Sequence, residues 1–438
     1  MFKLPTVATA PFCPSEVTGS VTVVSTDAVW KKILRFAGPG LLISIGYMDP
    51  GNWATAISAG SSFGYSLLFV VVLSSLAAML LQSMSLRLGI VTGKDLAKLC
   101  SEQYARPTAM AMWFFAELSI IACDIAEVLG CALAFKLILG VSLPVAIGIT
   151  ALDTIFVLGL KGAGFRKVEA IILGLIATIS VCLLAELVLL HPCWTCAAQG
   201  TMPSLSALKN TESLYLAIGI LGATVMPHNL YLHSSVVQTR KIGHSDAHRR
   251  EAIRFANVDS IISLTFALLI NAAILILAAA AFHGQSVVME LDDAYHLLDP
   301  VTGSAFAGLI FGIGLLASGQ SSTFTGTIAG QVILDGFLQM KIPCWQRRIV
   351  TRGLALIPAL IGVTVWGEHS VGRLLILSQV VLSLQLPFVM YPMIKMAGNA
   401  RLMGQFKSTW PVQALAWVLF VVISGANAWL VLHTFDLV

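Results

Sequence analysis

Two short stretches of this sequence carry side chains that can bind a metal cation. Residues 48–52 (MDPGN) supply the carboxylate of Asp49 and the neutral amide oxygen of Asn52. Residues 226–229 (MPHN) begin with Met226, whose thioether is a soft donor. Soft donors favour transition metals over Ca²⁺ and Mg²⁺, which prefer shells of oxygen alone. The two stretches therefore predict a transition-metal site if the fold brings them together, although a methionine in an apolar helix is more often part of the packing.

Each stretch interrupts an apolar run with a proline, Pro50 or Pro227. A proline lacks the backbone N–H and ends or kinks a helix. We expect the carbonyls freed by unwinding to face a cavity, where they can join the side-chain ligands around a cation. A pair of ordinary proline kinks is the alternative. Asp49 argues against that alternative, because a charge at this depth costs at least a few kcal/mol unless it is paired or functional.

Three acids of one later span have the spacing of a single helix face. Glu117, Asp124 and Glu127 are seven and three residues apart, which predicts a stripe about 15 Å long. Buried carboxylates hold and exchange protons, and chains of them serve proton transfer in membrane transporters. The alternative is structural ion pairing with a basic residue such as Arg352. The two interpretations can hold together.

Two histidines follow Pro227 on the other side of the predicted break. His228 and His233 are five residues apart and therefore point in different directions on a helix. An imidazole titrates near pH 6.5, which suits an acid-activated step. For either histidine, a structural role is as well supported as a role in proton transfer.

The composition assigns these residues to a membrane. Of 438 residues, 57% are apolar and 11% charged, with a mean hydropathy of +0.87, whereas a soluble domain has about 25% charged residues. A soluble or disordered chain is excluded, and the lipid bilayer is the expected partner. The net charge of +4 comes without a long basic run, so nucleic acid is excluded as a main partner.

Eleven apolar stretches are long enough to cross a bilayer core, and they predict an all-α integral membrane protein. With the N-terminus in the cytoplasm and the C-terminus outside, all 26 Lys and Arg residues except Lys136, Lys209 and Arg373 lie on the inner side. The spans run near residues 39–61, 66–88, 109–139, 143–160, 171–190, 214–237, 259–282, 305–336, 348–366, 374–394 and 411–432.

The interruptions fall in the first and sixth spans. These two spans occupy equivalent positions if the first ten spans form two five-helix repeats. Paired interruptions of this kind are typical of inverted-repeat transporters with a binding site at the midplane. The predicted organisation is a cytoplasmic tail (1–36), a first repeat (37–200), a second repeat (201–396) and an additional eleventh helix (397–438).

The motifs around both breaks resemble the Nramp family of proton-coupled divalent metal transporters, from about residue 36 to the end of the chain. The resemblance implies a leucine-transporter-like (APC) fold that carries Mn²⁺ or Fe²⁺, and in this family also Cd²⁺ or Co²⁺, inward with protons. It also places Arg352 opposite the acids on a proton route. The motifs are residues 49–52 (DPGN), 223–234 (ATVMPHNLYLHS) and 330–337 (GQVILDGF), and the implied metal ligands are Asp49, Asn52, the Ala223 carbonyl, Met226 and Gln379.

A sodium- or proton-coupled symporter of an organic solute such as an amino acid is the main alternative, since the same fold class includes such carriers. Asp49 would repel a substrate carboxylate, which disfavours it. A receptor that keeps the fold without transport is a second alternative, and an enzyme is the least expected class, because no cofactor motif stands out. The metal ions and protons are substrates, no cofactor is expected, and nothing indicates an obligatory protein partner. The compact chain favours a bacterial inner membrane.

A Cys-x-x-Cys pair, Cys193 and Cys196, lies in a predicted polar loop. Without a second pair of ligands, its spacing leaves two uses open, oxidation or loose metal binding.

Overall fold

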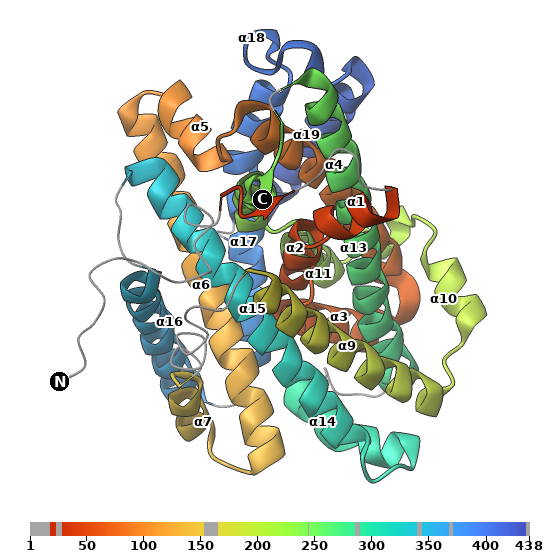
Figure 1. Cartoon of the computed structure of the whole chain (residues 1–438). Helices are drawn as coiled ribbons and strands as arrows, with labels where there is room; N and C mark the ends of the chain where they lie inside the picture. The colour runs from red at the N-terminus through yellow and green to blue at the C-terminus, as the bar shows by residue number, and fades with distance from the viewer. Residues whose placement is uncertain are drawn as a thin grey trace, which may run out of the picture.

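The computed structural model describes residues 18–22, 29–152, 165–243, 245–284, 290–339, 344–367 and 371–434. Part of the predicted tail (1–36) and the second half of the predicted fourth span (143–160) therefore lie outside the described residues. Within them the chain is a bundle of helices with one pair of two-residue strands (Figure 1).

The first half of the chain begins with a short helix and continues into a helix that is interrupted. Leucine, isoleucine, valine and alanine dominate these segments, and prolines stand in the first turn of several of them, where a missing N–H is tolerated. The elements are α1 (Val29–Phe36), α2 (Pro39–Gly46), α3 (Pro50–Phe63), η1 (Gly64–Leu67), α4 (Leu68–Thr92), α5 (Leu96–Gln103), α6 (Arg106–Leu139), α7 (Leu143–Thr150), α9 (Phe165–Leu190) and α10 (Trp194–Gly200).

The second half contains another interrupted helix and four of the longest helices. The elements are η2 (Leu205–Leu208), α11 (Thr211–Val225), α12 (Pro227–Val236), η3 (Val237–Thr239), α13 (Asp246–Phe282), α14 (Leu291–Thr302), α15 (Ala307–Leu338), α16 (Cys344–Trp366), α17 (Val371–Ala397), α18 (Ala400–Met403), η5 (Gly404–Phe406) and α19 (Trp410–Thr434).

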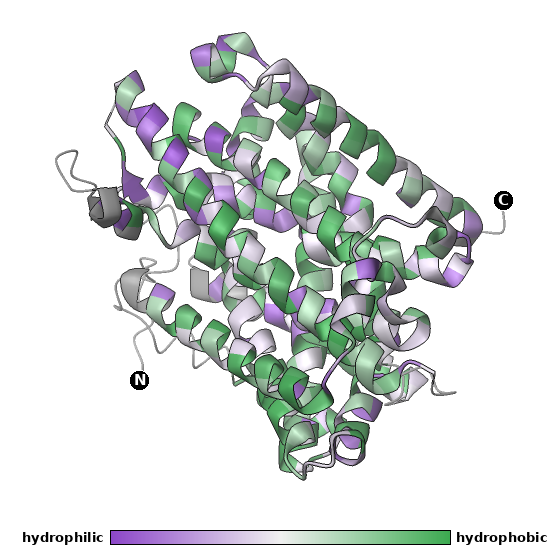
Figure 2. Ribbon diagram, turned by 90° about the vertical axis from the view of Figure 1, so that its right-hand side faces the viewer, coloured by the Kyte–Doolittle hydropathy of each residue, from purple (hydrophilic) through white to green (hydrophobic). Residues whose placement is uncertain are grey.

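Seven helical segments of the described residues are long and apolar enough to cross a membrane. Apolar residues cover most of the long helices, and hydrophilic ones gather toward the upper left end in Figure 2. The structure thus confirms an all-helical, multi-pass membrane protein. Length and composition alone do not establish the predicted count of eleven.

The interrupted helices lie in the interior of the bundle, where the long helices surround them (Figure 1). Helix α13 packs along α2, α3 and α4, and α15 packs against α6 and α9. Helix α17 reaches α3, α6 and α11. Residues near both interruptions therefore face protein instead of lipid.

The start of α2 is anchored by charged side chains from distant segments. Asp259 of α13 accepts hydrogen bonds from the backbone N–H groups of Gly38 (3.4 Å) and Gly40 (2.7 Å). Arg240 donates to the carbonyl of Ala37 (2.7 Å) and pairs with Glu169 of α9 at 3.0 Å. Next to this cluster, β1 (Val21–Thr22) pairs in parallel with β2 (Arg240–Lys241).

The acidic segment after α13 forms a helix, α14. Glu290 and Asp293 cap its start reciprocally, and Asp292 pairs with Lys136 at 3.1 Å. A capping box supplies acceptors for the free N–H groups of a first turn, which explains why these acids begin a helix.

Candidate metal site and proton pathway

The first interruption separates α2 from α3 at residues 47–49. Asp49 has extended backbone angles (φ −65°, ψ 164°), and its Oδ1 accepts the backbone N–H of Asn52 at 3.0 Å. Pro50 follows in the first helical position, which is the usual place for a proline. The carboxylate is therefore the N-cap of α3, where a helix terminus favours negative charge.

The second interruption is a single residue, Met226, between α11 and α12. Its φ of 27° lies in the left-handed region, which non-glycine residues seldom adopt. Its side chain is fully buried and packs against Ala122 and Leu382, and Asn229 donates to its sulfur at 3.6 Å. The packing around the thioether holds this residue in an uncommon backbone conformation.

The two interruptions meet through Asn52. Its Nδ2 donates to Asp49 Oδ1 at 2.5 Å and to the carbonyl oxygen of Ala223 at 3.0 Å. From α17, Gln379 donates through Nε2 to the other oxygen, Oδ2, of Asp49 at 3.3 Å. Asp49, Ala223 and Gln379 are fully buried. The structure thus brings together four of the five residues proposed as metal ligands, and Leu382, which contacts Met226, lies three residues beyond Gln379.

Two carbonyls of the unwound segment are not free to bind a cation, which corrects the sequence expectation for them. The Tyr47 carbonyl accepts the side-chain amide of Asn271 at 2.7 Å, and the Met48 carbonyl accepts the hydroxyl of Ser318. Both donors come from neighbouring helices, α13 and α15. These two residues hold the interruption open, a role that the sequence did not reveal because serine and asparagine in a membrane helix usually join helices.

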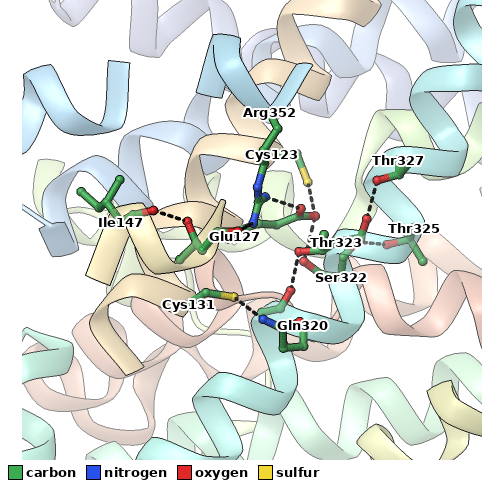
Figure 3. A network of polar contacts seen from close by, with 12 residues as sticks. Cys123, Glu127, Cys131, Ile147, Gln320, Ser322, Thr323, Thr325, Thr327 and Arg352 are labelled. Carbon is green, nitrogen blue, oxygen red and sulfur yellow. Dashed lines mark hydrogen bonds and ion pairs between the residues drawn. The ribbon is translucent and has the colours of Figure 1, made fainter. Parts of the chain in front are cut away.

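Glu127 of α6 is the centre of a second polar cluster, shown in Figure 3. Its Oε1 accepts the hydroxyl of Ser322 at 2.9 Å and the thiol of Cys123 at 3.6 Å. Its Oε2 lies 3.9 Å from the guanidinium of Arg352, which also donates to the carbonyl of Thr150 at 3.4 Å. Both charged side chains are buried. The ion pair that the sequence offered as an alternative is therefore present.

The other two acids of α6 differ in burial. Asp124 is buried, and both it and Glu127 face Gly326 of α15, where an added Cβ would lie 3.3 Å from Asp124 Oδ1 and 2.9 Å from Glu127 Oε1. Glu117, two turns away, is half-buried. The buried face therefore contains Asp124 and Glu127, with Glu117 at its margin.

The two histidines of α12 contact different neighbours, as their spacing predicts. His228 Nε2 lies 3.9 Å from the sulfur of Cys123, which connects the second interruption with the Glu127 cluster. His233 Nδ1 lies 2.8 Å from Oε1 of Gln82, whose Nε2 donates to the hydroxyl of Tyr47 at 2.8 Å. The role of Cys123 was not predicted from the sequence.

The donors near the interruptions are a carboxylate, amides, a carbonyl and a thioether. In the described residues there is no group of three or more His, Cys, Asp and Glu side chains that could hold a metal. A site for one ion here would therefore combine hard oxygen donors with one soft sulfur. Such a mixed donor set suits a transition-metal ion. It differs from the cysteine and histidine ligands of a structural zinc site.

Two broken helices that meet at a buried carboxylate inside an all-helical membrane bundle are typical of transporters. The family model described as "Natural resistance-associated macrophage protein-like" (Nramp) matches residues 40–433. The chain therefore belongs to the Nramp family, whose members are metal ion transporters and not enzymes.

Individual relatives agree with this assignment. The chain is 61% identical over 436 residues to a protein of Ralstonia nicotianae named "Divalent metal cation transporter MntH", covering 98% of this chain and 99% of the relative. A crystal structure of the Eremococcus coleocola manganese transporter superposes with a TM-score of 0.88 at 38% identity, covering 95% of this chain and 90% of that one.

The fold is shared more widely than the sequence. The nucleobase-cation-symport transporter Mhp1 superposes with a TM-score of 0.57 at 13% identity, over 97% of this chain and 92% of that one. That likeness concerns the fold alone, and it agrees with the leucine-transporter-like class.

Proposed function

We propose that this chain imports Mn²⁺ or Fe²⁺ together with protons, and that the metal binds where α2–α3 and α11–α12 are interrupted. The proposed ligands are Asp49, Asn52, the Ala223 carbonyl, Met226 and Gln379. The name of the Ralstonia relative supports a divalent metal cation as the cargo. The metal ion and the protons are substrates, so no resident cofactor is required.

The observation that carries the proposal is the convergence of two acceptors on one point between the interruptions. Asp49 Oδ1 and the Ala223 oxygen lie 2.5 Å and 3.0 Å from the same nitrogen, Asn52 Nδ2. A cation can replace the two amide hydrogens there if the Asn52 amide turns its oxygen inward. The Oε1 of Gln379 is buried and has no hydrogen-bond partner among the described residues, so a further oxygen is available beside Asp49.

The thioether supports a transition metal as cargo. Met226 occupies the interruption itself, and its sulfur is buried against α6 and α17. A sulfur donor contributes little to the binding of Ca²⁺ or Mg²⁺ but favours softer ions. Mn²⁺, Fe²⁺, Cd²⁺ and Co²⁺ are therefore the expected substrates.

The proton route is proposed to begin at Asp49 and to continue along α6. Metal binding to Asp49 displaces its proton, since a carboxylate must be ionised to bind a metal. His228 lies between the interruption and Cys123, which contacts Glu127. From Glu127 and Asp124 the proton would pass along Arg352 toward the cytoplasm. His233 and Glu117 are proposed to contribute at the ends of this route.

The proposed membrane topology has eleven helices, two inverted five-helix repeats (37–200 and 201–396) and an additional α19, with the N-terminus in the cytoplasm. Cys193, the N-cap of α10, and Cys196, in the first turn of that helix, form a disulfide. A disulfide is typical of an oxidising compartment, which supports the outer side for this segment. The bacterial source of the relative supports an inner membrane, with the C-terminus outside.

The organic-solute symporter is the competing function within this fold. Helix N-termini at a midplane site attract a substrate carboxylate. Here the N-terminus of α3 is already capped by Asp49, whose negative charge opposes such a substrate. The geometry therefore favours a cation.

Flux into proteoliposomes with an internal pH dye tests the proposal. We expect the wild type to take up Mn²⁺ and Fe²⁺ while the interior acidifies, with little uptake of Ca²⁺ or Mg²⁺. Asp49→Ala should abolish both signals. Glu102→Gln, which alters an exposed acid paired with Lys94, serves as the control and should keep both. Undiminished Mn²⁺ uptake by Asp49→Ala would refute the site.

A further inference from the structure

One buried acid has no part in the proposed route. Glu186 lies on α9, one turn before the helix ends at Leu190, and its side chain is fully buried. Neither of its carboxylate oxygens has a hydrogen-bond partner in the part of the chain that the structure describes. Buried polar groups are nearly always hydrogen-bonded in native proteins, so this carboxyl group needs an explanation.

Glu186 lies on α9, which packs against α15, and α15 in turn contacts α3 of the first broken helix. Cys182, four residues earlier, shares a face of α9 with Glu186. At Gly314 of α15 an added Cβ would lie 3.3 Å from the Cβ of Cys182 and 3.0 Å from the ring of Trp53. Trp53 belongs to α3 and packs edge-to-face against Phe311, with ring centroids 5.2 Å apart.

Among the described residues, the helices packed against α9 offer no cation that could compensate an ionised Glu186. Helices α2 and α3 contain no titratable residue, and neither do residues 260–282 of α13 or residues 307–334 of α15. The remaining neighbour is α14, whose titratable residues have other contacts or are exposed. Asp292 pairs with Lys136, and Asp293 caps the start of α14. Asp299 accepts a hydrogen bond from the backbone N–H of Gly308. Tyr295 packs on His296, which is exposed.

We propose that Glu186 is a second proton-binding site of this transporter, occupied as a neutral carboxylic acid when the outer half of the bundle is closed. An isolated ionised carboxylate in the membrane interior is strongly unfavourable, and such a group binds a proton instead. The apolar packing of Cys182, Trp53 and Phe311 around Gly314 on this side of α9 fits a neutral group.

The site couples external pH to closure of the outer half. This step rests on the alternating access of the proposed function, in which α3 must separate from α15 to admit a cation. That separation moves Trp53 away and lets water reach Glu186, which then ionises. Because the closed state binds the proton more tightly than the open state, acid outside favours closure, and this preference is lost as the external pH rises.

Infrared spectroscopy on the full-length protein tests the protonation directly. We expect a C=O stretching band of a protonated carboxylic acid in the wild type at neutral pH, and we expect Glu186→Gln to lose it. Glu212→Gln, which alters an exposed acid at the start of α11, should keep the band. A wild-type spectrum whose acid bands are all retained in Glu186→Gln overturns the proposal.

Uptake of Mn²⁺ into proteoliposomes tests the coupling. Glutamine imitates the protonated acid and so favours the closed outer half at every pH. Glu186→Gln should therefore lower uptake at external pH of about 7.5 by about twofold or more and flatten the dependence on external pH. An unchanged pH profile in correctly folded Glu186→Gln overturns the coupling. Loss of proton entry in the wild type would contradict the proposed function instead, and the infrared band would still report on Glu186.

Discussion

Gly51 and Gln379 lie so close together that a Cβ on residue 51 would be 1.7 Å from Nε2 of Gln379. The same nitrogen donates to Asp49 at 3.3 Å. The absence of a side chain at residue 51 therefore lets α17 reach the interruption of the first helix. This contact connects the first and second halves of the chain at the proposed metal site.

Gly51→Ala should displace Gln379 and weaken metal binding. Loss of a group that positions a metal ligand typically reduces affinity by about 10- to 100-fold, and we expect a loss in that range for Mn²⁺, measured by calorimetry on purified protein. Gly174→Ala is a matched control, because an added Cβ there meets no atom within 4 Å. Equal affinities of wild type and Gly51→Ala would show that Gln379 does not support the site.

Met226→Ala should relax the discrimination against hard ions. Without the thioether, the remaining donors are oxygens, which suit Ca²⁺ and Mg²⁺. Competition assays should show Ca²⁺ or Mg²⁺ inhibiting Mn²⁺ uptake in the variant, and Cd²⁺ uptake should fall more than Mn²⁺ uptake. Met202→Ala, at an exposed methionine, should behave as wild type. Continued exclusion of Ca²⁺ from Met226→Ala would contradict the role given to sulfur.

The interruptions themselves could be predicted from sequence, because a proline beside a charged or soft side chain in an apolar run is a local signal. The partners of the unwound backbone could not. Asn271 and Ser318 lie more than 200 residues from the carbonyls they bind, and neither residue type is unusual in a membrane helix. The sequence did not predict α14 either, since an acidic segment can cap a helix as well as form a loop.

Glu127→Gln should separate proton flux from metal flux. Glutamine can still accept the hydroxyl of Ser322, but it carries no exchangeable carboxyl proton. We expect clearly less acidification per Mn²⁺ transported, because a glutamine side chain cannot take up and release a proton as an intramembrane carboxyl group does. Simultaneous recording of metal and pH dyes gives this ratio. Ser322→Ala removes only the hydrogen bond and should retain most of the coupling, so an equal loss in both variants would point to a structural role for Glu127.

Arg240→Met should destabilise the end of the bundle where α2 begins. Arg240 is fully buried, pairs with Glu169 at 3.0 Å and holds the carbonyl of Ala37 before α2. Breaking a buried pair from one side costs about 3–5 kcal/mol, because the other charge stays buried. We expect a lower unfolding temperature in detergent and partial recovery when Glu169→Gln is added. Arg249→Met, which breaks an exposed pair with Asp246, should change stability by less than about 1 kcal/mol, and a similar small effect of Arg240→Met would show that the pair does not stabilise α2.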